Sequence, residues 1–108
     1  MEKIVALCAI VLAYNTLTMA ALAAPPPPPT GAAAFEANCA ECHPGGRNIV
    51  TPAKDLRGPT LKANGIHNPQ DIVAKMRKPG PGMTRFDPKD LPDKEALEIA
   101  EYILATFK

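Results

Sequence analysis

Two cysteines and a histidine share one pentapeptide of this 108-residue sequence, Cys39-Ala40-Glu41-Cys42-His43. The C-x-x-C-H spacing is the attachment signature of a c-type haem. On a helical turn, two thiols three residues apart can form thioethers to the two vinyl groups of one porphyrin. The histidine that follows then lies under the iron and can serve as its proximal ligand. The motif therefore predicts one covalently attached haem c.

Three other chemistries use paired cysteines, and each fits this sequence less well. A zinc site needs four ligands, and only His67 could add a nitrogen to this crowded set. A thioredoxin-like dithiol would be accompanied by a βαβ pattern, which the sequence lacks. A disulfide between Cys39 and Cys42 would close a small, strained ring and stabilise the chain little. Haem attachment is favoured over all three.

The second axial ligand decides what a haem iron does, because an open site binds gases or peroxide whereas two protein ligands favour electron transfer. Met83 is the favoured sixth ligand, since prolines stiffen its loop (78–86) and the glycines there are small enough to pass close to a porphyrin. Met76 on a helix face, His67 in a loop and an open site remain less favoured alternatives. We predict no catalytic residue; the predicted cofactor-binding residues are Cys39, Cys42, His43 and Met83, the last two being the iron ligands.

Residues 1–23 resemble a secretory signal peptide, with one lysine, an apolar run and a small-residue cleavage site. Cleavage after Ala23 fits the A-x-A pattern, and cleavage after Ala24 is the alternative. An uncleaved anchor is a second alternative, because the segment 4–24 has the roughly 20 residues that span a bilayer. Its polar residues make it a poor span. We expect a periplasmic protein without a membrane span after cleavage, or a membrane-anchored one if the signal is retained.

The remaining chain divides into a proline-rich linker, residues 24–30, and one small domain, residues 31–108. Five consecutive prolines favour a polyproline II spacer, or simply a disordered mature N-terminus. The domain is short and only 5% of the chain is aromatic, so its core needs additional apolar surface. A buried porphyrin would supply that surface. Without haem, we expect the chain to be largely disordered.

The helix signals predict an all-α domain with three main helices. The first is capped by Thr30 and extends through Asn38 into the haem motif. The second begins with Asn68-Pro69 and ends near Lys78, because Pro79 follows. The third begins near 92–95 and has a wide apolar face. No alternating pattern typical of strands is present.

The stretch 31–107 resembles the class I monohaem c-type cytochromes. It is most similar to the small soluble cytochromes that replace plastocyanin in photosynthetic electron transfer and to their relatives in metal-respiring bacteria. The matching pieces are Gly31 and Phe35, the haem motif, Gly45 to Asn48, Lys54 to Leu56, the methionine loop and Ala100 to Leu104. The family's methionine is usually followed by proline, where Thr84 stands here, whereas Phe86 matches.

The resemblance implies the small class I cytochrome c fold, in which the first and last helices cross. It thus implies that Phe35 packs near Ile99 and Tyr102. Lys54 becomes a candidate partner for a haem propionate, with a solvated lysine as the alternative. The Nδ1–H of His43 is expected to donate to a loop carbonyl, assigned to Pro52.

The uneven charge of the chain bears on its partners. A formal net charge of +1 argues against a nucleic-acid partner held by bulk electrostatics. Between residues 44 and 86 the basic residues outnumber the acids by eight to two, whereas six acids and two lysines lie between 87 and 107. We expect a basic collar near the haem edge and an acidic far side. This asymmetry would orient encounters with acidic redox proteins.

These features together predict a monomeric periplasmic one-electron carrier that is not an enzyme and whose iron is ligated by histidine and methionine. The alternative is a haem sensor or small peroxidase with an open or displaceable sixth coordination site. That alternative ranks lower, because the sequence shows no distal histidine and arginine set for peroxide cleavage.

Overall fold

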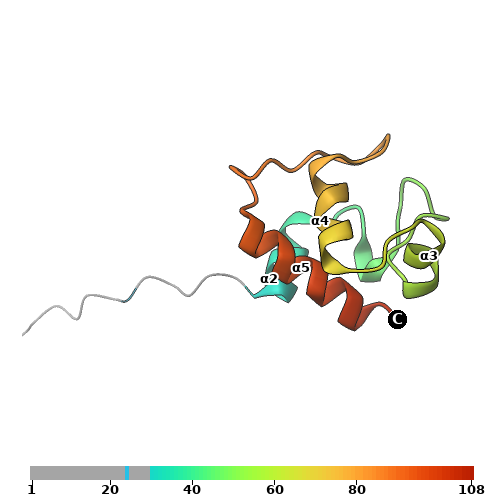
Figure 1. The fold of residues 1–108 in the computed structure, drawn as a ribbon, viewed down its shortest axis with the longest axis horizontal. Helices are drawn as coiled ribbons and strands as arrows, with labels where there is room; N and C mark the ends of the chain where they lie inside the picture. Colours follow the sequence, from blue (N-terminus) through green and yellow to red (C-terminus); the bar gives the residue numbers. More distant parts are fainter. Residues whose placement is uncertain (1–23, 25–29) are drawn as a thin grey trace, which may run out of the picture.

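The computed structural model describes residue 24 and residues 30–108 (Figure 1). The predicted signal peptide and most of the predicted linker lie outside the described residues. Within them the chain forms helices and loops and no strand, which confirms the all-α prediction. The elements in order are α2 (Gly31–Asn38), the 3₁₀ turn η1 (Pro44–Gly46), α3 (Gly58–Ala63), α4 (Pro69–Arg77) and α5 (Asp93–Thr106).

Side-chain caps begin two of the three longer helices, α2 and α4, whereas α5 begins after Pro92 without one. The Thr30 hydroxyl accepts a hydrogen bond from the Ala33 N–H (3.3 Å), and the Asn68 side chain accepts one from the Asp71 N–H (2.9 Å). These side chains satisfy N–H groups that have no partner within the helix. α4 ends at Arg77, because proline disfavours helical geometry in the residue before it. The predicted bounds of α2, α4 and α5 are therefore confirmed to within a residue or two.

The sequence prediction did not include the short helix α3. Its first residues, Gly58 and Pro59, look like a turn in the sequence, and six residues are too few for an amphipathic repeat. Proline is nevertheless compatible with the first helical turn, where its missing N–H costs no hydrogen bond. Leu61 is buried in the core and anchors the helix. Tertiary burial therefore stabilises a helix that local signals leave undecided.

Helix α5 is central to the fold, with α2 and α4 both packed against it (Figure 1). The Phe35 ring of α2 lies 5.4 Å from the Tyr102 ring and 5.3 Å from the Phe107 ring, measured between centroids. Phe35 and Ile99 belong to the same buried cluster. The expected packing of Phe35 near Ile99 and Tyr102 is confirmed, and Phe107 completes an aromatic triad.

Gly31 permits the close crossing of α2 and α5. A Cβ atom at this position would collide with the Glu98 backbone carbonyl and would lie 3.2 Å from the Tyr102 Cβ. Because a helix backbone cannot yield locally, an added methyl group would push the two helices apart.

We therefore predict that Gly31→Ala lowers the free energy of unfolding by about 2 kcal/mol, within the usual range for overpacking. Thermal denaturation of the haem-loaded protein, followed by circular dichroism, would measure the loss. Gly58→Ala is the matched control, because its added Cβ would have no neighbour closer than 3.9 Å. Equal stability of the Gly31 variant and the wild type would contradict this account of the crossing.

Candidate functional site

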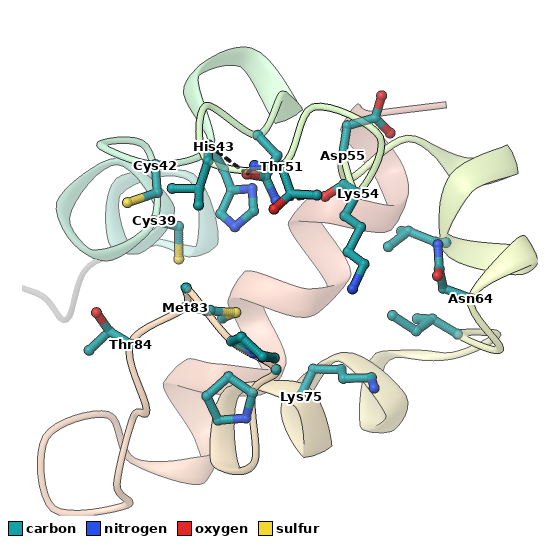
Figure 2. Close-up of a pocket in the computed structure, with 18 of the residues that line it drawn as sticks. Cys39, Cys42, His43, Thr51, Lys54, Asp55, Asn64, Lys75, Met83 and Thr84 are labelled. Atoms are coloured by element: carbon teal, nitrogen blue, oxygen red, sulfur yellow. Dashed lines mark hydrogen bonds between the residues drawn. The ribbon is translucent and has the colours of Figure 1, made fainter.

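A cavity of about 250 Å³ opens between the haem motif on one side and the loop 78–86 on the other. All four predicted cofactor-binding residues line it (Figure 2). The two less favoured ligands do not: Met76 is only 2% exposed within the core, and His67 is exposed beside the first turn of α4. The structure thus brings the four predicted cofactor-binding residues together and leaves Met76 and His67, the alternative sixth ligands, outside the cavity lining.

The haem motif follows α2 as one further hydrogen-bonded turn. The N–H groups of Cys42 and His43 both donate to the Cys39 carbonyl, over 3.2 and 2.8 Å. This turn presents both thiols and the imidazole to the same cavity. Cys39 is partly buried, which raises the pKa of its thiol to about 11, whereas Cys42 is exposed. The predicted helical-turn arrangement of the motif is confirmed.

The His43 ring is fixed by the backbone of the loop that follows it. Its Nδ1 lies 2.8 Å from the Arg47 carbonyl oxygen. A carbonyl can only accept a hydrogen bond, so Nδ1 carries the proton and Nε2 keeps its lone pair free for a metal. The expected bond to a loop carbonyl is confirmed, but its assignment to Pro52 was wrong. The turn η1, in which Gly45 and Gly46 have positive φ, reverses the chain early and brings the Arg47 carbonyl to the ring.

Asn48 organises the first loop beside the cavity, a role that the sequence analysis did not assign to it. Its side-chain oxygen accepts hydrogen bonds from the N–H groups of Val50 (3.0 Å) and Thr51 (2.8 Å). Its amide nitrogen donates to the Lys54 carbonyl over 2.9 Å. Asparagine side chains commonly bond the backbone two residues further along the chain, so the residue type itself was a signal for this turn.

The loop 78–86 places Met83 opposite the haem motif. Figure 2 shows the Met83 thioether and the His43 ring facing each other from opposite sides of the pocket. Gly82 has a φ of 87°, and a Cβ there would lie 3.1 Å from the Val50 side chain. A larger residue would therefore be strained, and it would also push against the first loop. The glycine lets the two loops meet at the edge of the cavity.

One end of the cavity is positively charged. Lys54 and Lys75 line this end, and both side chains extend along it in Figure 2. Asp55 also lines the cavity. A side-chain hydrogen bond with Thr60, and then a hydrogen bond from the Arg57 N–H, lower the pKa of the Asp55 carboxyl. The lining at this end thus carries two ammonium groups and one carboxylate, and Figure 2 shows that carboxylate pointing away from both lysines, so this end is suited to anionic groups.

Of the eight basic residues expected to form a collar, only Lys54 and Lys75 line the cavity. Arg77 is held by Asp93 at 2.6 Å, and Arg85 pairs with Asp87 at 3.3 Å. The positive surface next to the cavity is therefore narrower than a count along the sequence indicates.

The residues around the cavity fit a haem c. The wall that holds His43 also presents two thiols, and the facing wall presents the Met83 thioether. An imidazole and a thioether together are a known pair of iron ligands in cytochromes. Apolar side chains and two prolines supply surface for a porphyrin face, although asparagines and threonines also belong to the lining. The ammonium groups of Lys54 and Lys75, at one end of the cavity, suit the ionised propionates that a haem carries. The donor set, the apolar walls and the charged end agree with one cofactor.

Comparison with known proteins supports the same cofactor. The profile of the family described as cytochrome C oxidase, cbb3-type, subunit III matches residues 26–103. Cytochrome c6 of Thermostichus vulcanus is 34% identical over 104 residues, covering 95% of this chain and 90% of that protein. The solved structure of OmcF, outer membrane cytochrome F from Geobacter sulfurreducens, is 44% identical with a TM-score of 0.71, covering 72% of this chain and 99% of that one. That of cytochrome c6 from the diatom Phaeodactylum tricornutum is 34% identical with a TM-score of 0.64, covering 69% and 87%.

With this fold and this site, the chain belongs to the class I c-type cytochromes, as its sequence resemblance implied. Within the class it is a monohaem cytochrome related to cytochrome c6 and to Geobacter OmcF. Members of this group are electron carriers and not enzymes, and they hold one covalent haem c. The predicted cofactor and the general function are confirmed.

Proposed function

We propose that this protein is an exported one-electron shuttle whose iron is held between His43 and Met83. The observation that carries the proposal is the convergence of the imidazole and the thioether from opposite walls of a cavity that two thiols also line. When bound, haem c supplies the Fe(II)/Fe(III) couple. Cys39 and Cys42 would hold it as thioethers, and His43 and Met83 would both ligate its iron.

Each residue of the site has a distinct effect on the couple. The Arg47 carbonyl fixes the His43 ring and raises its basicity as a ligand. The Met83 thioether favours Fe(II) over Fe(III) and so raises the reduction potential. Lys54 would offset the charge of a propionate at the charged end of the cavity, which leaves the Lys75 ammonium as positive charge there. With both iron ligands supplied by the chain, the site would suit transfer of one electron without making or breaking a bond.

The absorption spectrum of the purified, exported protein tests this proposal. We expect a low-spin ferric spectrum with a methionine–iron charge-transfer band, and a reduced form that binds carbon monoxide only slowly, because the thioether must first leave the iron. The intact mass would show one attached haem. A high-spin ferric spectrum with ready carbon monoxide binding would contradict the proposal and favour a sensor or small peroxidase.

We further propose a periplasmic location, with residues 1–23 removed, residues 24–30 as a linker and residues 31–108 as the cytochrome domain. The support is the signal-like pattern of the N-terminus. No helix in the described part of the chain is both long and apolar enough to cross a bilayer. The mass of the exported protein would reveal cleavage after Ala23 or retention of the segment as an anchor.

The mouth of the cavity has the features of a docking surface for redox proteins. Ile49, Val50 and Met83 are the exposed large hydrophobic residues of the described chain, at 62, 56 and 38% exposure. Val50 and Met83 also line the cavity, whose other end holds Lys54 and Lys75. Exposed apolar side chains and positive charge on the lining of one cavity suit a partner that offers an apolar contact and acidic residues.

We predict that oxidation of the reduced protein by the anion hexacyanoferrate(III) slows by about tenfold as salt is raised from low to physiological concentration. Positive charge beside the haem edge attracts this oxidant, and salt screens the attraction. The cationic oxidant tris(phenanthroline)cobalt(III) is expected to show no such decrease. Lys75→Gln should flatten the hexacyanoferrate dependence, whereas Lys89→Gln, outside the cavity lining, should not. A salt-independent rate would contradict steering by the lysines.

A further inference from the structure

Arg77, the last residue of α4, joins the methionine loop to two helices. Its Nη1 donates to the Phe86 carbonyl over 3.1 Å, and its Nη2 donates to the Asp93 carboxylate over 2.6 Å. The side chain is only 19% exposed, whereas that of Asp93 is 78% exposed. Phe86 lies three residues after Met83, and Asp93 is the first residue of α5. One partly buried guanidinium therefore spans α4, the loop and α5.

Both backbone polar groups of Phe86 are hydrogen-bonded to residues of α4. Its N–H donates to the carbonyl of the buried Met76 over 2.9 Å, while its carbonyl receives the Arg77 bond. Closer to Met83 the loop is held more loosely, since the Met83 N–H is 3.4 Å from the Gly80 carbonyl. Glycines at 80 and 82 add backbone freedom. The position of Met83 thus depends on how firmly the base of the loop is fixed.

We propose that Arg77 is a positioning residue for Met83, holding the base of the loop so that the thioether stays at the iron. This inference rests on the proposed function, in which Met83 is the sixth ligand. A charged donor forms a stronger bond to a carbonyl than a neutral one does. Asp93 directs the guanidinium and is itself favoured at a helix N-terminus. Lysine could not replace both bonds, because only arginine presents several donors in a fixed fork.

The experiment compares Arg77→Met, Arg77→Lys and Asp93→Asn in the haem-loaded protein. Two readouts report ligation directly: the pH at which the methionine–iron band is lost on alkaline titration, and the rate of carbon monoxide binding to the reduced form. For Arg77→Met we expect that pH to fall by about one unit and the rate to rise about tenfold, which corresponds to one lost charge-assisted hydrogen bond. Arg77→Lys should recover part of the effect. Asp93→Asn should show a smaller one, because the Phe86 bond remains.

Arg85→Met is the matched control, since it removes an arginine of the same loop whose ion pair with Asp87 is exposed on both sides. It should leave both readouts at the wild-type values. If Arg77→Met does not fold, Arg77→Lys and Asp93→Asn carry the test. The inference is overturned if the Arg77 variants lose thermal stability yet keep the wild-type band and carbon monoxide rate. A wild type without the band would instead overturn the proposed function itself.

Discussion

Replacement of Met83 by alanine is expected to convert the protein from an electron carrier into a haem protein that binds ligands. Because Met83 lies opposite His43 in the cavity, the variant would lose the methionine–iron band and its reduced form would bind carbon monoxide. Met83→His would keep two ligands and lower the reduction potential by on the order of 0.1 V or more, within the range that axial ligands cover. Spectra and potentiometric titration would measure both effects.

Substitution of the two alternative ligands provides the control for this prediction. Met76→Leu conserves volume within the core, so we expect a loss of stability below about 1.5 kcal/mol and an unchanged band. His67→Gln alters an exposed loop residue and should change neither property. Retention of the band in Met83→Ala, with its loss in either control, would assign the sixth ligand elsewhere.

Removal of both thiols is expected to abolish the folded domain as well as haem attachment. The haem motif and the loop 78–86 lie on opposite sides of the cavity. The described core fully buries few large side chains, the largest being Phe35, Leu91 and Ile99. In Cys39→Ala/Cys42→Ala the porphyrin would no longer be retained, and the apolar surface that it supplies would be lost. The expected loss is the whole stability, on the order of 5 kcal/mol or more for a small domain.

Intact mass and circular dichroism would test this second prediction. The double variant should carry no haem, lack a cooperative thermal transition and show weak helical signal. Each single variant should retain haem through one thioether and fold with reduced stability. A double variant that melts cooperatively with the wild-type helix content would show that the chain folds without its cofactor. In the wild type, thiol-alkylating reagents should modify neither cysteine.

The chemistry and the class of this protein could be predicted from short stretches of sequence. The C-x-x-C-H motif acts within one turn, where the Cys42 and His43 N–H groups both bond the Cys39 carbonyl. The caps Thr30 and Asn68 act within three residues of the helices that they begin. Such features depend on neighbours along the chain, so residue order alone determines them.

Only the tertiary structure decided which distant groups meet at the site. It assigned the His43 partner to Arg47 and not Pro52, and it added the helix α3. It also placed Met76 in the core and Met83 in the cavity. Arg77, which we expected in the basic collar, forms an ion pair with Asp93 instead. These contacts depend on the path of the backbone through its turns and on which side chains compete for burial. Spacing along the sequence does not specify either of them, because small changes in a turn redirect everything that follows it.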